Sequence, residues 1–462
     1  PLAEPIPDAR LAVAITDAIA ADPVLRSEAV RVSVASGQVM LGGTVRTLAQ
    51  KWRAERLAGG FKGAVAVTDG VVVTAAPRAD ADIARDVDEA IANYPATRSA
   101  GVKVTVAGAT VTLGGTTDSS AQRDLVAELA SRVQGVRDVR LALTVRRASP
   151  RSDSEIAGDA TDTIHDDARL DGALVAVAVH AGVATLTGTV GSLAERDAAV
   201  EDAREAGAAD VDSRGLRIDW RENERLRAAT RRPPPTDDFI ATAVRRRLSN
   251  DARVGAATPA VSAAQGVVTL SGTVGDFRAD RAAVRDARRV SGVVRVEDRI
   301  TVLPAKRQAD ATIEKQALRG IYEDVAAPDT RGVQVLVANA KVTLRGSVAS
   351  PEDRRVIEDD VEEVPGVVAV QDDLKIRGYG PQTVVVPPDA VRSRVRESIF
   401  WDPRVGPGEV QVQGGHDGDV TLGGAVDTWQ EARAAVDDAV RAGAAHVTDD
   451  LHVADAPGDA GR

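Results

Sequence analysis

The sequence predicts an α+β protein built from six small tandem domains, each with the order α-β-β-α-β and a three-stranded mixed sheet covered by two helices. Three observations predict this fold. A seven-residue segment with a glycine at its fifth position recurs six times, a helix pattern and a strand precede each copy, and an alanine-rich helix pattern and a last strand follow it. The spacing of 72 to 84 residues between successive copies is the length of one small domain.

The recurring segment alternates apolar and small polar residues, which is typical of a strand with one buried face. It reads VMLGGTV (39–45), VTLGGTT (111–117), ATLTGTV (184–190), VTLSGTV (268–274), VTLRGSV (342–348) and VTLGGAV (420–426). The shared glycines, hereafter the motif glycines, are Gly43, Gly115, Gly188, Gly272, Gly346 and Gly424. We expect them to be structural, because glycine lets a helix or a neighbouring strand approach the sheet or permits a local bulge.

The elements before the motif are a helix and a strand. DADIARDVDEAIAN (80–93) places Ile83, Val87 and Ile91 on one apolar stripe, which predicts an amphipathic helix. An acidic residue near the start of this helix in most copies suits the positive end of a helix dipole. VKVTV (102–106) and the turn AGA (107–109) then lead into the motif, so the two strands are expected to form a β-hairpin.

The elements after the motif are a second helix and a closing strand. RADRAAVRDARRV (278–290) and WQEARAAVDDAVRA (429–442) are rich in alanine on the side that would face a sheet, so helix and sheet can approach closely. The closing strands include VVRVEDRITV (293–302), VVAVQDDLKI (367–376) and AAHVTDDLHV (444–453). This order of elements predicts two helices on one face of a small sheet.

The V-x-L-x-G-x-V motif and the closing V-x-x-x-L-x-V strand together resemble the BON domain, named for bacterial osmotically induced and nodulation proteins. The resemblance covers most of the chain in six copies and implies the same α-β-β-α-β fold. The predicted domains are 6–76, 77–148, 152–219, 237–304, 308–377 and 388–454, with a Pro/Arg-rich linker at 220–236. The second copy departs from the motif at Thr117, and Gly215 interrupts the closing strand of the third, so looser packing is expected in both.

The linkers predict a second level of organisation, two groups of three domains. The longest interval between motif glycines contains WRENERLRAATRRPPPTDD (220–238), and its run of prolines favours an extended, semi-rigid spacer. The segments at 79–87 and 308–316 open their domains similarly, which fits duplication of a three-domain ancestor. Six equal beads on a string are the alternative.

The sequence favours a non-enzymatic protein without a cofactor or a metal. Cysteine is absent, which excludes thiol catalysis and cysteine-ligated metal sites. GGFKG (59–63) lacks the spacing of a phosphate loop and is explained by helix capping, and there is no G-x-S-x-G motif. No metal-binding spacing joins the histidines, which are His165, His180, His416, His446 and His452. We expect the adjacent carboxylates to be solvated surface; they include Asp359, Asp360, Asp372 and Asp373.

Charge is distributed unevenly along the chain. The net charge is −11, yet residues 217–307 hold 19 Lys+Arg against 11 Asp+Glu, whereas 308–462 hold 16 against 28. Within the basic region, arginines recur every three or four residues on the second helix of the fourth domain, opposite Val284 and Val290, and are expected to face solvent. This stripe comprises Arg278, Arg281, Arg285 and Arg288, and Arg245, Arg246 and Arg247 on the preceding helix extend it.

The arginine stripe has two interpretations. It is a candidate contact site for anionic lipid headgroups or for acidic segments of a protein partner, including a second copy of the chain. Nucleic acid is the least favoured partner, because the total charge is acidic and aromatic residues make up only 2% of the chain. Alternatively, the stripe is an ordinary solvated helix face with Asp280 and Asp286 nearby.

The favoured function is a non-enzymatic scaffold or surface-binding protein. The resemblance implies links to osmotic and envelope stress and to phospholipid or protein partners, and repetition strengthens weak contacts through avidity. A potassium or small-ligand sensing module is one alternative, since a branch of the family resembles potassium-binding proteins. A self-assembling structural protein is the other.

Two features of the sequence bear on the compartment. No stretch approaches the roughly 20 apolar residues that a membrane-spanning helix needs. The segment PLAEPIPDAR has neither the basic nor the apolar part of a signal peptide, and Pro1 fits removal of an initiator methionine, which favours the cytoplasm. The periplasm, after removal of a signal peptide that this chain does not contain, is the alternative.

Overall fold

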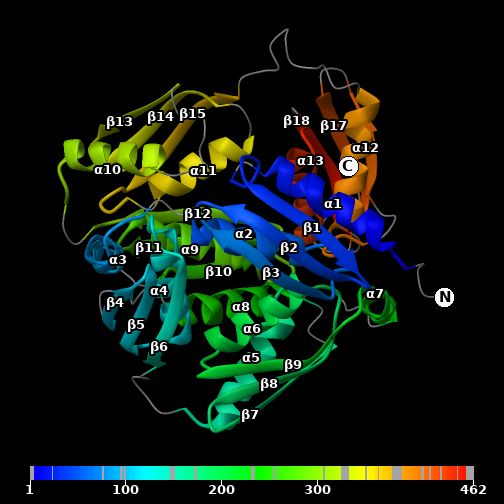
Figure 1. Ribbon diagram of the computed structural model, residues 1–462. Coiled ribbons are helices and arrows are strands. Elements are labelled where there is room, and N and C mark those ends of the chain that lie inside the picture. Colours follow the sequence, from blue (N-terminus) through cyan, green and yellow to red (C-terminus); the bar gives the residue numbers. More distant parts are fainter. Residues whose placement is uncertain are drawn as a thin grey trace. The chain divides into compact units, whose positions relative to one another are not determined.

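The computed structural model divides the chain into two compact units, each described by itself below. Unit 1 comprises Pro1–Ala20, Leu25–Arg231 and Ser249–Gly255, and unit 2 comprises Ala21–Val24, Arg232–Leu248 and Ala256–Arg462. The structure describes residues 5–22, 24–74, 77–93, 97, 100–145, 151–170, 174–229, 235–251, 253–254, 258–304, 307–323, 332–348, 351–362, 364–376, 388–406, 410–415, 418–426, 429–444 and 446–453. Each unit contains three of the six sheets, which agrees with the predicted two groups of three domains (Figure 1).

The predicted α-β-β-α-β order is confirmed for all six domains. Unit 1 contains α1 (Asp8–Ala21), β1 (Ala29–Ala35), β2 (Gln38–Val45), α2 (Leu48–Gly59), β3 (Ala66–Val73); α3 (Asp80–Asn93), β4 (Gly101–Ala107), β5 (Thr110–Thr117), α4 (Ser120–Arg132), β6 (Asp138–Val145); α5 (Asp153–Asp166), β7 (Val175–His180), β8 (Val183–Val190), α6 (Leu193–Glu205), β9 (Asp210–Ile218) and α7 (Trp220–Ala229). Unit 2 contains α8 (Asp237–Asn250), β10 (Ala260–Ala264), β11 (Val267–Val274), α9 (Phe277–Arg288), β12 (Arg295–Val302); α10 (Asp310–Glu323), β13 (Val333–Ala338), β14 (Lys341–Val348), α11 (Pro351–Glu362), β15 (Ala369–Ile376); α12 (Pro388–Trp401), β16 (Gln411–Gly414), β17 (Asp419–Val426), α13 (Trp429–Arg441) and β18 (His446–Val453).

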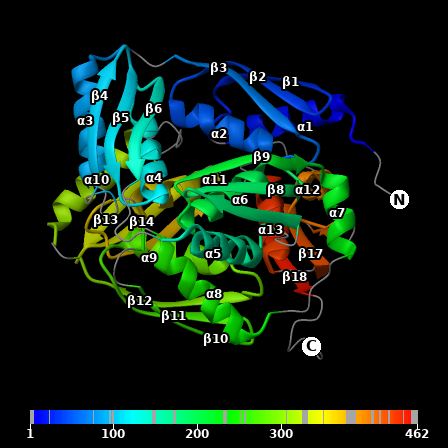
Figure 2. The same cartoon turned by 90° about the horizontal axis from the view of Figure 1, so that it is seen from below.

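Each domain has a mixed three-stranded sheet with the motif strand in the middle. The first two strands pair antiparallel as a hairpin, and the closing strand pairs parallel to the motif strand, as β10, β11 and β12 do. Along β11 the residues Val268, Leu270 and Val274 are buried, whereas Gly272 and Thr273 are exposed. Figure 1 shows α10 and α11 together on one face of the sheet β13–β15, and Figure 2 shows α2 along one face of β1–β3. The two helices of a domain therefore cover one face of its sheet.

The motif glycines have a backbone conformation that other residues rarely adopt. Their φ angles lie between +104° and +130°. At Gly43, Gly115, Gly188 and Gly346 an added Cβ would lie 1.8 to 2.0 Å from a carbonyl oxygen of the neighbouring hairpin strand or of the residue before it. Gly272 has φ +115° but open space, since its nearest neighbour would be the Ala260 amide nitrogen at 3.8 Å. The glycines are thus required by a positive φ and, in four copies, by a close approach of the adjacent chain.

In the first five domains, the acidic residue at the start of the first helix holds the hairpin turn of its own domain. Asp153 of α5 accepts hydrogen bonds from the backbone N–H groups of Ala181 and Gly182, both at 2.8 Å. These turn residues have φ angles of 50° and 78°, a conformation that matches the twist of the two strands. The same pair of hydrogen bonds is made by Asp8, Asp80, Asp237 and Asp310. Sequence reasoning placed these residues correctly but assigned them only to the helix dipole.

Replacing Asp153 with alanine should destabilise the third domain by about 1–3 kcal/mol, because two turn N–H groups lose a shared carboxylate acceptor. Urea unfolding of the full chain, followed by circular dichroism, measures the loss. Asp153→Asn is the matched variant, since an amide retains one oxygen and should lose less. Equal midpoints for wild type and Asp153→Ala would contradict this role of the carboxylate.

The predictions for the closing strand of the third domain and for the linker need correction. Gly215 does not interrupt β9; it lies beside a β-bulge, where the register with β8 shifts between Thr185 and Thr187. Thr117 is buried, and looser packing of the second domain stays a prediction. The linker predicted at 220–236 is not extended throughout, because its first part forms the helix α7. The Glu224 carboxylate of this helix forms an ion pair with the buried Lys62 ammonium at 3.1 Å. Its first two prolines lie outside the described residues.

Candidate functional site

The second helices of the three domains in unit 1 form a closed ring. Helices α2, α4 and α6 each contact the other two. At the junction of α2 and α6 an added Cβ on Gly59 would lie 3.2 Å from Leu193 Cβ, so the two helices touch there without an intervening long side chain. The faces of the second helices that point away from their own sheets are therefore domain interfaces rather than open surface.

The junction between the second and third domains is held by polar contacts. The Arg204 guanidinium of α6 lies 3.0 Å from an Asp124 carboxylate oxygen of α4. The Ser120 hydroxyl donates to the Ala208 carbonyl oxygen at 2.7 Å, and this serine is buried. The Arg123 guanidinium reaches the neighbouring Ala209 carbonyl at 3.5 Å. Together these contacts fix how the α4 helix meets the end of α6.

Exchanging the charges of Arg204 and Asp124 tests this junction. Arg204→Asp and Asp124→Arg should each destabilise unit 1, and the double variant should recover part of the loss, because it restores one attractive pair. The coupling should be about 0.5–1 kcal/mol, since both side chains are partly solvated. A double-mutant cycle from urea unfolding measures it, and strictly additive single effects would show that the pair does not contribute.

Unit 2 contains a similar arrangement around α11. Helix α11 contacts both α9 and α13. Phe277 at the start of α9 and Val302 at the end of β12 pack into the apolar core of the fifth domain. Beside this apolar contact, the Arg285 guanidinium of α9 lies 3.9 Å from the Glu362 carboxylate of α11. The fourth and fifth domains are therefore joined by one apolar and one ionic contact.

The ionic contacts fall at matching places in the two units. We number the residues that follow each motif glycine, so that Asp124, nine residues after Gly115, is at position 9 of the second domain. Arg204, sixteen residues after Gly188, is at position 16 of the third domain. Arg281 and Glu362 occupy the same two positions in the fourth and fifth domains, and Arg281 interacts electrostatically with Glu362. Position 16 of one domain thus meets position 9 of the preceding domain in both units, with the charges reversed.

The predicted arginine stripe is not a continuous solvent-facing surface. Arg247 is 2% exposed and Arg278 is 9% exposed, so both are buried. Arg281 forms ion pairs with Asp280 at 2.9 Å and Asp298 at 2.6 Å, and Arg285 approaches Glu362. The prediction that all of them face solvent is wrong, because one face of α9 packs on β11 and β12 and another meets α11.

The remaining arginines of the stripe are more accessible. Arg245 is exposed, and Arg246 and Arg288 are partly buried. Arg281 also lies over the Phe277 ring, with its guanidinium carbon 5.0 Å from the ring centroid. Contact of any of these arginines with an external partner stays a prediction.

Glu362 lies among charges from two helices at this junction. Burial, and after it the neighbouring Asp359, raises the pKa of Glu362 to about 7, while Arg281 and Arg285 oppose this and Asp280 adds to it. On the α9 side, burial raises the pKa of Asp280 to about 6 against the effect of Arg281. The junction therefore changes its protonation close to neutral pH.

A second acid pair lies between α11 and β15. Burial, and then a hydrogen bond to Asp372, raises the pKa of Glu358 to about 8. Burial also acts to raise the pKa of Asp372, but hydrogen bonds from Glu358, the Leu374 amide and Arg354 outweigh it and lower this pKa. The two carboxyl groups thus share a proton held by Glu358. The expectation that Asp372 is solvated surface is wrong, since its side chain is almost buried and paired with Arg354.

The described histidines lie on different elements of the structure. His165 lies 3.4 Å from Asp166, while His180, His446 and His452 lie on the strands β7 and β18. His416 lies outside the described residues. Within the described part of the chain, no group of three or more histidine, aspartate or glutamate side chains could hold a metal ion.

Comparison with known families confirms the resemblance seen in the sequence. The model of the BON domain family matches six segments, 7–75, 79–147, 152–218, 236–304, 309–378 and 389–455. The chain belongs to the BON domain family. Each match spans one sheet and its two helices, so the junctions described above are contacts between successive BON domains.

Comparison with solved structures adds only weak similarities. The C-terminal domain of CdsD, the structural protein of the type III secretion system of Chlamydia trachomatis, is 17% identical, with 46% of this chain and 100% of that chain covered. A second CdsD structure is 9% identical, with 63% and 91% covered. Both have TM-scores of 0.13, too low to bear on function. No match is found among curated proteins. Of the described helices, none is both long and apolar enough to span a membrane.

Sequence reasoning missed the charged residues that join the BON domains. A signal for them exists in the repeat register, because positions 9 and 16 carry Asp124 and Arg204 in one pair of domains and Arg281 and Glu362 in another. The helical period places both positions on one face, two turns apart. The charges at the two positions are reversed between the units, with an acid at position 9 in unit 1 and a base at position 9 in unit 2. This reversal indicates that the two positions contact each other, because a common external partner would favour the same sign in both units.

Proposed function

We propose that this BON-domain protein is a non-enzymatic scaffold that presents several equivalent sheet surfaces to a partner. The observation that carries the proposal is the ring of second helices in unit 1. Because the helix faces are used to join the domains, the open faces of the three sheets are the repeated surfaces left for binding. Several weak contacts held at fixed spacing bind a surface more firmly than one.

The open sheet faces of unit 1 carry exposed polar and basic residues beside the exposed apolar side chains of Met40 and Val72. Exposed residues along the first strands include Ser33 on β1 and Thr105 on β4. Arg31 and Lys103 are exposed at corresponding places on the same two strands. A flat surface with exposed cations suits an anionic membrane surface or an acidic protein. Links to osmotic or envelope stress, and a cytoplasmic rather than periplasmic location, remain parts of this proposal.

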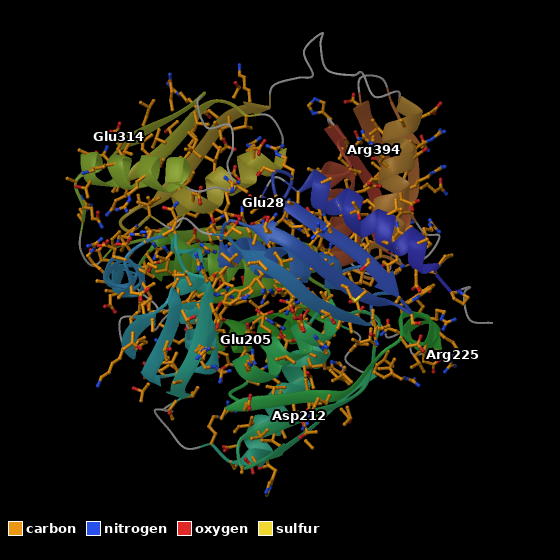
Figure 3. The ribbon with its side chains drawn as sticks, in the orientation of Figure 1. Glu28, Glu205, Asp212, Arg225, Glu314 and Arg394 are labelled. Atoms are coloured by element: carbon orange, nitrogen blue, oxygen red, sulfur yellow. The ribbon has the colours of Figure 1, made fainter. Side chains whose placement is uncertain are left out.

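Co-sedimentation of the full chain with vesicles of phosphatidylglycerol tests the surface-binding part. Arg31→Glu combined with Lys103→Glu should weaken binding at low ionic strength without changing the unfolding midpoint, since both side chains are exposed. Arg394→Glu, on α12 of the sixth domain, is the matched control and should bind as the wild type does (Figure 3). Absence of vesicle binding by the wild type would overturn a lipid partner, and crosslinking in cell extract would then test a protein partner.

Surface binding cannot be tested by reversing the charges of Arg278, Arg281 and Arg285, because such variants would also disturb the packing of the domains. Arg278 is buried, and the other two lie at the junction with the fifth domain. Their replacement by glutamate should separate or unfold the fourth and fifth domains, so reduced vesicle binding would not identify a contact site.

Two alternative functions, potassium sensing and self-assembly, can each be tested separately. Calorimetry with potassium against sodium tests the potassium-sensing module, where equal heats for the two ions would count against it. Light scattering at low and high salt tests self-assembly, where a monomer under both conditions would count against it.

A further inference from the structure

An aspartate on the closing strand of the fourth domain occupies the free edge of its sheet, the side of the strand that has no hydrogen-bonded neighbour. The Leu303 amide, directly after β12, donates to the Val274 carbonyl oxygen of β11 at 2.9 Å. Amides alternate in direction along a strand, so that of Ile300 points away from β11. The Asp298 carboxylate accepts this outward amide at 3.0 Å. Asp298 therefore covers a donor that another strand could use.

The same contact recurs on four of the other five closing strands, β3, β9, β15 and β18. In each, an aspartate accepts the amide two residues further along its own strand, at 2.7 to 3.1 Å; the pairs are Asp69 with Val71, Asp212 with Arg214, Asp372 with Leu374 and Asp449 with Leu451. A carboxylate at this place uses the outward N–H group and repels the carbonyl oxygens of an incoming strand. Charged residues that point inward at a sheet edge are a known protection against edge-to-edge pairing.

The closing strand of the second domain, β6, lacks this aspartate. On the other regular closing strands the aspartate lies opposite the leucine of the motif strand, but the residue opposite Leu113 is Leu141. Leu141 is 45% exposed. Asp138 accepts the Val139 amide at the start of the strand, whereas no side chain in the described part of the chain accepts the Leu143 amide.

The apolar side chains of β6 form a continuous row along this unprotected edge. Val139, Leu143 and Val145 alternate with polar or small residues and are only partly buried, and Leu141 lies between them. β6 is the last strand of the sheet β4–β6, with β5 on its other side (Figure 1). An exposed apolar edge strand with free backbone donors is a template for a further strand.

The sequence of β6 is complementary to itself in an antiparallel pairing centred on Leu141. Leu141 then lies opposite its counterpart in the second copy, and Val139 lies opposite Leu143, so apolar side chains meet on one face. The N–H groups of these three residues point to the free edge, as hydrogen-bonded pairs require. On the other face no charged residue lies opposite another, because the pairs are Asp138 with Thr144 and Arg140 with Ala142.

We propose that two copies of this chain associate through β6, so that the sheets of their second BON domains join across a twofold axis. Because both copies use the same strand, the contact is isologous and is complete with two chains. One pair of strands is a small interface, so the dimer should be weak and should depend on protein concentration. The contact uses a strand edge rather than the open sheet faces and does not rest on the scaffold proposal.

Light scattering of the full chain over a range of protein concentrations tests the dimer. The wild-type mass should rise toward twice that of one chain. Leu141→Asp introduces the aspartate of the other closing strands and should stay monomeric at every concentration, with an unfolding temperature no lower than that of wild type, because Leu141 is exposed. Val72→Asp is the matched control, since Val72 is a 58% exposed apolar residue on the closing strand β3, and it should dimerise as the wild type does.

Three results in this experiment would overturn the proposal. A wild type that is monomeric at all concentrations would show that the second copy is not the partner, as would be the case if β6 bound an extended segment of another protein. A dimer that persists in Leu141→Asp would place the contact elsewhere. An equal loss of dimer in Val72→Asp would show that the effect is not specific to β6.

A cysteine variant locates the contact without relying on loss of association. The chain contains no cysteine, so Leu141→Cys introduces a single thiol per chain. At the centre of the pairing the two thiols lie on directly opposite residues, whose Cα atoms are about 5.5 Å apart, within the range of a disulfide. Oxidation should therefore link two chains in Leu141→Cys and leave Val72→Cys unlinked. Absence of the link in Leu141→Cys, or equal linking in Val72→Cys, would contradict a contact through β6.

Discussion

Replacing Gly346 with alanine is expected to unfold the fifth BON domain. The alanine Cβ would lie 1.9 Å from the Gly332 carbonyl oxygen, so β13 and β14 would have to separate. The φ of +117° adds backbone strain that only glycine avoids. Strain of about 1–2 kcal/mol and overpacking of about 1–3 kcal/mol together approach the stability of a small domain.

The matched comparison is Gly272→Ala in the fourth domain. Gly272 has nearly the same φ, +115°, but its added Cβ would meet nothing closer than 3.8 Å. This variant should lose only the strain, about 1–2 kcal/mol. Hydrogen exchange read by mass spectrometry reports each domain of the full chain separately. Equal loss of protection in the two variants would show that the close approach to the Gly332 carbonyl does not matter.

Unit 2 should become less stable as the pH rises from about 4.5 to 7, because of Glu362. Its ordinary pKa of 4.5 is raised to about 7 in the folded protein, where its side chain is 21% exposed. In this window the unfolded chain has lost the proton and the folded chain retains it, so folding requires proton uptake and weakens with increasing pH. The contribution is fully present below pH 4.5 and lost above 7, about 3 kcal/mol in total.

The variant Glu362→Gln isolates this effect, because it keeps the shape of the side chain and removes its titration. Urea unfolding of wild type and variant at pH 5, 6, 7 and 8 gives their difference in stability, which should grow in favour of Glu362→Gln up to pH 7 and then stay constant. Glu314→Gln on α10, labelled in Figure 3, is the matched control in the same domain and should follow the wild type. A difference that does not vary with pH would show that Glu362 retains an ordinary acidity.

The fold could be predicted from the sequence because each helix and strand follows from a periodic pattern of apolar residues that are only a few positions apart. The alternation of Val268, Leu270 and Val274 around Gly272 specifies a strand with one buried face, and its recurrence sets the register of all six domains. The stripe of Ile83, Val87 and Ile91 specifies the helix that covers it, and all three side chains are buried. These features depend on neighbours a few residues apart, so one sequence suffices to find them.

The interfaces could not be predicted, because they depend on residues that meet only when whole domains pack together. Arg281 and Arg285 looked like a solvated stripe, since an arginine on the outer face of an isolated helix faces water. In the structure that outer face meets α11, and the same arginines face Glu362. Helical periodicity defines which residues share a face but contains no information about what the face contacts.

The sequence by itself determined the family, the number of domains and the place of each motif glycine. The tertiary structure decided which charged residues are partners, that Asp153 and its counterparts hold hairpin turns 28 to 30 residues away, and that Glu362 titrates near neutral pH. The difference lies in how far apart in the sequence the interacting residues are. A strand or a helix follows from apolar periodicity over one or two turns, whereas burial of a carboxylate and the identity of its counter-ion are set by the packing of separate domains.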